Sequence, residues 1–374
     1  MTDGTDMGST APASLAGSPL DVADLRARVQ QVVDETIREQ QDLLDTVSPD
    51  LSPLIEAIAA LLSGGKRLRP AFAYWAWRGV TGAVAAPGAD DAAMRAAAGL
   101  EFLQACALIH DDVMDGSDTR RGLPAAHRRF AGVHRDHSWL GSPEAFGTGA
   151  AILLGDMCLS WADEVIFSCD FPATTMARAK RIYDEMRTEL MAGQYLDLLE
   201  QVRGGGSVER ALTVVRYKSA KYTIERPLHL GAALADAPAE VFSTYSAYGL
   251  PLGEAFQLRD DILGVFGDPT ETGKPAGDDL REGKRTVLVA TAMERSTPGQ
   301  AAVIRHHLGD PALNLDGVEQ LRSVIRETGA LEHTESLIAT LLEQSISALD
   351  TDLLDHEARG VLTALAYAAT RRKV

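Results

Sequence analysis

GLEFLQACALIHDDVMD, residues 99–115, begins as an almost uncharged apolar run and ends in a cluster of aspartates. The apolar part predicts a buried helix, and at helical spacing Asp111 and Asp115 lie one turn apart on the same face. Two carboxylates that point into one space repel each other unless a cation lies between them. Magnesium suits this position, because it takes a few carboxylate oxygens together with water and phosphate. The alternative is an acidic run that forms an ordinary solvated helix face.

A second acidic pair and several basic clusters favour the metal interpretation. Asp260 and Asp261 lie in another apolar stretch, and Arg120 and Arg121 follow the first cluster within a loop that is rich in Gly, Ser and Asp. Upstream, Gly64–Pro70 contains two glycines and then three cations within a few residues. Because guanidinium groups bind phosphate oxygens bidentately, the pattern predicts a magnesium-diphosphate site.

Several blocks, taken in order, resemble the trans-isoprenyl diphosphate synthase (polyprenyl synthetase) family. They are Gly64–Pro70, Ile109–Gly122, Gly193–Asp197, Tyr217–Ala220, Phe256–Gly264 and Gly267–Thr286. The resemblance covers roughly residues 50 to 290 by motif, and the remaining tail by helical pattern only.

This resemblance implies two diphosphate substrates, an allylic diphosphate and isopentenyl diphosphate, and several Mg²⁺ ions. The residues implied to bind metal are Asp111, Asp115 and Asp260, with Asp112 and Asp261 in support and Lys218 counted with them as catalytic. The residues implied to hold the allylic diphosphate are Arg120, Lys218, Ser219, Gln257 and Lys274. The residues implied to hold isopentenyl diphosphate are Lys66, Arg69, Gln104, Arg121 and Lys284, while Gln194 is a neutral neighbour.

The chain departs from the family's pattern at two positions. Many relatives carry a histidine seven residues before the first aspartate of the first motif, where this chain has Gln104. Many also close the second motif with a third aspartate, where this chain has Gly264. The first departure removes a charge from the isopentenyl site, and the second removes one potential metal ligand.

Product length is predicted from the small residues below the first motif. Because a helix rises ~1.5 Å per residue, Cys106 and Ala107 lie about one turn beneath Asp111, and Leu103 lies roughly one turn lower. Relatives with aromatic rings at the upper positions make shorter products, so the small pair predicts a C20 product. C25 or longer and C15 remain open, because Met157 or Phe167 could form a floor and the small residues could simply be core packing.

The fold class expected is all-α, in one domain over residues 21–374 that follows a disordered tail at 1–20. Apolar residues recur at threes and fours, and no alternation of strands and helices is present. The helices expected are 25–44, 51–62, 95–109, 176–199, 208–234, 238–266, 286–294 and 318–349. The resemblance implies a bundle around a central cavity, and a homodimer.

Composition restricts the class of protein further. The net charge of −17 argues against an extended nucleic-acid surface, which needs a basic face. No uncharged apolar run reaches the ~18 residues that span a bilayer, so no membrane span is expected. A secretory signal begins with a basic region, and here no Lys or Arg precedes Arg26, so a secretory signal is not expected either. Three cysteines without paired spacing suit a reducing compartment, so a cytoplasmic location is expected.

The resemblance and the small residues together predict a geranylgeranyl diphosphate synthase that joins its substrates head to tail, and two other classes fit the sequence less well. A terpene cyclase also uses the first motif, but it needs a second motif of Asn or Asp, Ser or Thr, and Glu at four-residue spacing. Counted from Asp260, that spacing places Gly264 where the motif needs Ser or Thr and Asp268 where it needs Glu, so the cyclase motif is not present there. A noncatalytic partner subunit would show eroded Asp or Arg clusters, and here the clusters are whole.

Overall fold

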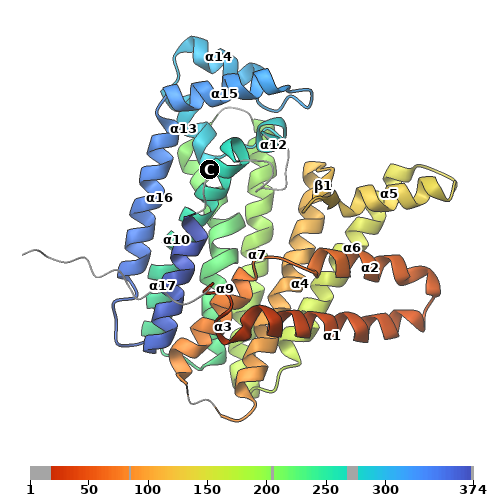
Figure 1. Cartoon of the computed structure of the whole chain (residues 1–374), viewed down its shortest axis with the longest axis vertical. Helices are drawn as coiled ribbons and strands as arrows, with labels where there is room; N and C mark the ends of the chain where they lie inside the picture. Colours follow the sequence, from red (N-terminus) through yellow and green to blue (C-terminus); the bar gives the residue numbers. More distant parts are fainter. Residues whose placement is uncertain (1–17, 84–85, 204–205, 268–276, 372–374) are drawn as a thin grey trace, which may run out of the picture.

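Helices make up almost all of the described chain, and the all-α prediction is confirmed (Figure 1). The computed structural model describes residues 18–83, 86–203, 206–267 and 277–371. Of the tail expected to be disordered, residues 1–17 lie outside this part, whereas Leu20 is described and buried.

The elements follow one another in chain order. The first half contains η1 (Val22–Asp24), α1 (Leu25–Asp45), η2 (Pro49–Leu51), α2 (Ser52–Leu62), α3 (Leu68–Thr81), α4 (Ala89–Asp115), β1 (Thr119–Arg120), β2 (Leu123–Pro124), α5 (Ala126–Asp136) and α6 (Pro143–Phe167). The second half contains α7 (Ala173–Arg203), α8 (Val208–Val214), η3 (Val215–Glu225), α9 (Arg226–Leu234), α10 (Ala239–Phe266), α12 (Asp278–Arg281), α13 (Val287–Arg295), α14 (Pro298–His307), α15 (Leu315–Glu327), α16 (Ala330–Ser347) and α17 (His356–Thr370).

Two hydrophobic cores hold the bundle together. The larger core joins α1, α3, α4, α6, α7 and α9, and it includes the buried rings of Trp75, Trp77 and Phe102. The smaller core joins the C-terminal half of α10 to α13, α15 and α16. Helix α10 belongs to both, since Tyr245 and Tyr248 lie in the first core and Ile262 lies in the second. The long helices therefore form one connected scaffold.

The expected helices are present, but α3, α5, α6, α12, α14 and α17 were not expected, and two of the expected helices differ from the prediction. Helix α6 was missed, because Pro143 and the glycines around it resemble a loop; Pro143 in fact lies in the first turn, behind the N-cap Ser142, whose hydroxyl accepts from Ala145 N at 3.2 Å. The expected helix 318–349 is two helices, because Gly329 takes a positive φ of 71° between α15 and α16. The expected helix 208–234 is continuous but changes character, since η3 is π-helical over 11 residues.

One described helix, α4, is long and apolar enough to cross a membrane. Of the most apolar 18-residue stretch of this helix, 72% is buried inside the bundle. Such burial is typical of a core helix in a folded domain. In Figure 1 this helix runs through the middle of the molecule, with α1 and α2 lying across it.

Candidate active site

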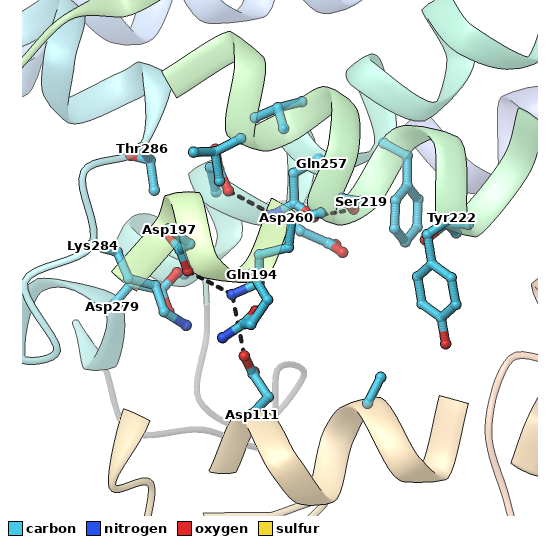
Figure 2. A pocket seen from close by; sticks show the side chains of 18 of the residues that line it. Asp111, Gln194, Asp197, Ser219, Tyr222, Gln257, Asp260, Asp279, Lys284 and Thr286 are labelled. Carbon is cyan, nitrogen blue, oxygen red and sulfur yellow. Dashed lines mark hydrogen bonds and ion pairs between the residues drawn. The ribbon is translucent and has the colours of Figure 1, made fainter. Parts of the chain in front are cut away.

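A cavity of about 620 Å³ lies among α4, α7, η3 and α10, with the segment 278–286 at one side. Figure 2 shows Asp111 on α4 facing Asp260 on α10 across this space. The cavity therefore brings the two acidic motifs together from distant parts of the sequence. Its lining includes these residues singled out in the sequence: Lys66, Arg69, Gln104, Ala107, Asp111, Arg120, Gln194, Lys218, Ser219, Gln257, Asp260, Asp261 and Lys284.

Lys218 connects the first acidic motif to α7. Its Nζ donates to Asp111 Oδ1 at 3.2 Å and to Asp197 Oδ2 at 2.6 Å. Burial by itself would raise the pKa of Asp111, but Lys218, Lys284 and Arg120 outweigh it and lower that pKa. Asp111 is thus held as a carboxylate at the cavity surface.

The position of Lys218 depends on a close approach of two helices. A Cβ on Gly193 would lie 2.3 Å from the backbone nitrogen of Lys218, so only glycine permits α7 to approach η3 this closely. The π-helical geometry of η3 directs Lys218, Ser219 and Tyr222 to the cavity. Such turns occur frequently at functional sites.

Asp112 is absent from the cavity lining and pairs with Arg120. Arg120 Nε donates to Asp112 Oδ1 at 3.0 Å and to Oδ2 at 3.2 Å, and Nη2 also contacts Oδ1. The Asp112 side chain is only 3% exposed, while Arg120 still lines the cavity and its Nη2 lies 3.8 Å from Asp111 Oδ2. Asp112 therefore anchors the arginine that reaches the cavity.

The last aspartate of the first motif, Asp115, is almost fully enclosed, with 2% of its side chain exposed. Neither carboxylate oxygen makes a hydrogen bond within the part of the chain that the structure describes. Burial and the nearby charge of Asp111 raise the pKa of Asp115 to about 6. Lys284 Nζ lies 3.4 Å from Asp115 Oδ2 and 2.8 Å from Glu282 Oε2, so this lysine joins α4 to the segment after α12.

The second acidic motif is supported by a short hydrogen-bond chain. Ser219 Oγ donates to Gln257 Oε1, and Gln257 Nε2 donates to Asp261 Oδ1 at 2.8 Å. Asp261 is buried, and burial raises its pKa to about 8, with smaller contributions from Asp279 and Asp260. Its Oδ2 has no hydrogen-bond partner among the described residues. Asp260 lies on the cavity surface beside it.

The part of the cavity near α3 is basic and contains Gln104. Arg69 Nη2 donates to Thr223 Oγ1 at 2.8 Å, and its guanidinium lies 4.2 Å from the centre of the Tyr222 ring. Tyr222 Oη donates in turn to Gln104 Oε1 at 2.8 Å. Lys66 also lines this part of the cavity.

Two other basic residues of this region make internal contacts. Arg121 Nη1 donates to Leu61 O at 2.7 Å and to Gly64 O at 2.8 Å, and the residue is absent from the cavity lining. Arg67 forms a buried ion pair with Glu101. The pKa of Arg121 is lowered mainly by burial. The neighbouring guanidinium groups, above all that of Arg67, lower it further. This concentration of positive charge favours the binding of an anion in the basic part of the cavity.

The remaining sequence predictions divide into three cases. Lys274 lies outside the described residues. Ala107 lines the cavity, whereas Leu103 and Cys106 are buried in the larger core and are absent from its lining. Sequence reasoning assigned no role to several further lining residues. They are Asp197, Tyr222, Thr223, Phe256, Asp278, Asp279, Arg285 and Thr286. All of them except Tyr222 and Thr223 lie within the motif blocks that resemble the family, so the signal that could have found them was present.

The donor set of the cavity fits Mg²⁺ with diphosphate. No group of three or more His, Cys, Asp or Glu side chains among the described residues is arranged to hold a metal by itself. Magnesium needs no such group, because it usually takes one or two carboxylates and completes its shell with water and substrate phosphate. Asp261 lines the cavity and has a buried carboxylate oxygen, whereas Asp115 has two buried oxygens but is absent from the lining. Arg69 Nε and Gln194 Nε2 are buried donors of lining residues, and they have no hydrogen-bond partner among the described residues.

The chain is similar to known proteins both in sequence and in structure. The family model described as "Polyprenyl synthetase" matches residues 52–325. A geranylfarnesyl diphosphate synthase of Aeropyrum pernix is 32% identical over 309 residues, which are 81% of this chain and 89% of that protein. A geranylgeranyl diphosphate synthase of Saccharolobus solfataricus is 30% identical over 71% of this chain and 74% of that protein.

Among solved structures, a crystal structure of geranylgeranyl pyrophosphate synthase from Corynebacterium glutamicum superposes with a TM-score of 0.90. It is 40% identical, and the match covers 95% of this chain and 100% of that chain. That protein was crystallised with isoprenyl diphosphate and magnesium.

Proposed function

This chain belongs to the polyprenyl synthetase family and is a trans-prenyltransferase, and from that premise we propose that it makes geranylgeranyl diphosphate, the C20 product. The observation that carries the proposed reaction is the shared cavity into which Asp111 and Asp260 face from two helices. Isopentenyl diphosphate and an allylic diphosphate are the two substrates.

Magnesium is the proposed cofactor, with several ions at the acidic surfaces of the cavity. Asp111, Asp115 and Asp260 would hold the ions, and Asp261 would support them. When bound, the ions supply positive charge to the diphosphate as its bond to the allylic carbon breaks. The comparison structure from C. glutamicum, crystallised with magnesium and isoprenyl diphosphate, supports this assignment.

The allylic diphosphate lies, in this proposal, against Lys218 and Arg120. Both side chains are already held in place, Lys218 by Asp197 and Arg120 by Asp112, so little side-chain freedom is lost when the anion binds. Ser219 and Gln257 orient the neighbouring carboxylates through their hydrogen bonds. The C–O bond breaks, the electron pair leaves with the diphosphate, and an allylic cation remains.

Isopentenyl diphosphate lies at the basic part of the cavity, against Lys66, Arg69 and Gln104. The double bond of this substrate attacks C1 of the allylic cation and forms the new carbon–carbon bond. Loss of a proton from the resulting cation then completes a 1'-4 head-to-tail condensation. The buried Nε donor of Arg69, which has no hydrogen-bond partner in the described part of the chain, favours an anion here.

Ala107 supports a product longer than C15, because this small residue lies on the cavity surface below Asp111. The 40% identity to a C20 synthase from C. glutamicum supports C20 in particular. A C25 product is the second candidate, since a geranylfarnesyl diphosphate synthase is among the relatives.

We propose in addition that the protein is a cytoplasmic homodimer. Exposed apolar side chains on α6 and α7 offer a surface for a second copy, and they include Ile152, Leu153, Met191 and Tyr195. The three cysteines are unpaired and buried, as suits a reducing compartment.

Incubation of the purified protein with radiolabelled isopentenyl diphosphate, Mg²⁺ and each allylic primer tests the proposal. Chromatography of the dephosphorylated products should place most of the label in a linear C20 alcohol. A main product of C25 would replace the C20 assignment. A cyclic product, or no incorporation with any primer, would overturn the proposed reaction.

A further inference from the structure

Arg67 turns inward from the segment Gly64–Pro70, whose other two cations line the cavity. Lys66 and Arg69 belong to the cavity lining, whereas Arg67 is absent from it and only 2% of its side chain is exposed. Arg67 directly precedes α3 with a φ of 53°, a left-handed conformation that is unfavourable for a residue with a side chain. The proposed reaction gives Arg67 no role, so its burial and its backbone conformation need another explanation.

The guanidinium of Arg67 joins three helices. It forms an ion pair with Glu101 on α4, whose side chain is 6% exposed, and its Nη2 donates to Gln30 Oε1 on α1 and to Leu62 O, both at 2.5 Å. Leu62 is the last residue of α2, where the backbone oxygens have no partner within the helix and carry partial negative charge. The planar fork of N–H donors allows arginine to make all of these contacts at once, and lysine has no such fork.

Glu101 lies on α4 close to a residue of the basic part of the cavity. Glu101 and Gln104 are three residues apart on this helix, so they are neighbours on its surface. Gln104 lines the cavity, whereas Glu101 does not. The ion pair therefore connects the helix that carries Gln104 to the segment that carries the two cavity-facing cations.

The buried ion pair of Arg67 and Glu101 acts through geometry more than through stability. Removing both charges from water offsets most of their attraction, so such a pair often contributes little net stability. Its directed contacts instead hold the chain between α2 and α3 in the conformation that leaves Lys66 and Arg69 at the cavity surface.

We propose that Arg67 and Glu101 are positioning residues for isopentenyl diphosphate, and that their ion pair holds the basic part of the cavity in its binding geometry. Neither side chain touches the substrate. This inference rests on the proposed function, because that function supplies the substrate. Cations that are held in place before binding lose less freedom when the anion binds. The ion pair should therefore strengthen the binding of isopentenyl diphosphate and leave the binding of the allylic diphosphate unchanged.

Calorimetric titration of the full-length protein with isopentenyl diphosphate alone tests the inference, because this substrate does not react without an allylic partner. A parallel titration with farnesyl thiolodiphosphate and Mg²⁺ measures binding of an allylic analogue that does not ionise readily. The variants are Arg67→Lys, Glu101→Gln and the double variant Arg67→Met/Glu101→Gln. Arg28→Met is the matched control, because Arg28 also joins α1 to α4, through Asp90 Oδ2 at 2.7 Å, but does not line the cavity.

Arg67→Lys and the double variant should each weaken the binding of isopentenyl diphosphate about tenfold, because long cationic side chains must then be ordered on binding. Neither change alters the net charge of the protein, so a general loss of positive charge does not explain the effect. Glu101→Gln separates positioning from simple electrostatics. It adds one net positive charge, which by itself would tighten binding, whereas loss of the charged contact with Arg67 should weaken binding about threefold. All three variants should bind the allylic analogue like the wild-type protein, and Arg28→Met should match the wild-type protein in both titrations.

Wild-type affinity for isopentenyl diphosphate in Arg67→Lys and in the double variant would overturn the inference and leave the proposed function intact. Equal weakening for both ligands would also overturn it, because a general loss of structure would then explain the result. Tighter binding in Glu101→Gln would show that charge matters and position does not. If the double variant does not fold, by circular dichroism, Arg67→Lys decides the question. A wild-type protein that binds no isopentenyl diphosphate would contradict the proposed function itself.

Discussion

Tyr222 Oη donates a 2.8 Å hydrogen bond to the side-chain oxygen of Gln104, the residue that stands where many relatives have histidine. This bond fixes which end of the amide is the acceptor, so both N–H donors of Gln104 are left for other partners. A neutral amide held in this way can donate to a phosphate, and it does so independently of pH. The departure at Gln104 is therefore matched by a partner on η3.

The first prediction concerns Tyr222→Phe. Loss of one hydrogen bond, worth ~1 kcal/mol, should raise the KM for isopentenyl diphosphate about fivefold, with kcat changed less than about twofold. Steady-state kinetics with the allylic primer saturating measure both constants. Tyr217→Phe is the control, because Tyr217 also lies on η3 but does not line the cavity. An unchanged KM in Tyr222→Phe would show that the orientation of Gln104 is set elsewhere.

The second prediction concerns the ion pair of Asp112 and Arg120. Arg120→Gln should destabilise the protein by ~3 kcal/mol, because it removes the guanidinium that pairs with the enclosed carboxylate of Asp112. Urea unfolding of both single variants and of Asp112→Asn/Arg120→Gln gives a double-mutant cycle. The free energy of unfolding should fall by ~1–3 kcal/mol less in the double variant than the sum of its losses in the two single variants. Additive losses would mean that the two side chains contribute independently.

The third prediction concerns pH and Asp261, whose folded-state pKa is raised to about 8 by burial. The pKa of the same group in the unfolded chain is ~3.9. Between pH ~3.9 and about 8, Asp261 is therefore protonated in the folded state and ionised in the unfolded state, so the free energy of unfolding falls as the pH rises through this range. In the metal-free protein, Asp261 should lower the free energy of unfolding by up to ~1.4 kcal/mol per pH unit. The stabilising contribution is complete below the unfolded pKa and is lost above the folded pKa.

Asp261→Asn should therefore lessen the decline in stability between pH 5.5 and 7.5, measured by urea unfolding in the presence of a chelator. Asn can still accept the hydrogen bond from Gln257, so folding is preserved. Asp352→Asn, at an exposed aspartate between α16 and α17, should keep the wild-type pH dependence. Identical slopes in Asp261→Asn and the wild-type protein would contradict the assigned titration.

The fourth prediction concerns product length. Ala107→Phe should shift the main product from C20 to C15, because an aromatic ring then fills the cavity below Asp111. Ala107→Ser, a variant of similar volume, should keep the wild-type distribution. Chain-length analysis of the dephosphorylated products separates the cases. If Ala107→Phe folds and its products are unchanged, the floor of the cavity lies elsewhere.

The sequence was sufficient for eight helical segments and for the acidic motifs, because both depend on local pattern, but the prediction left out α3, α5, α14 and α17. Residues 99–115 combine apolar content with two aspartates at one-turn spacing, and α4 indeed ends at Asp115. The π-helical geometry of η3 was not predictable in this way, because apolar periodicity does not distinguish it from an ordinary helix. Helix α6 was missed for a local reason, since Pro143 is a breaker inside a helix but favourable in its first turn.

The partners of the site residues depend on tertiary packing and could not be obtained from the sequence. Asp112 and Asp111 are adjacent in the chain, yet only Asp111 lines the cavity while Asp112 anchors Arg120. The contact of Asp279 with Gly264 joins residues on different helices, and it appears only when α12 packs on α10. The glycine at 264 was therefore visible in the sequence, whereas its closeness to Asp279 was not.

The π-helical geometry of η3 has an evolutionary consequence. A π-turn holds one more residue than an α-turn, so a single-codon deletion in Val215–Glu225 would leave a regular helix that still folds. That deletion would rotate the residues before it by ~100° relative to those after it, so the two ends of η3 could not both keep their present neighbours. Descendants of this gene should therefore tolerate substitutions in this segment far more readily than changes in its length.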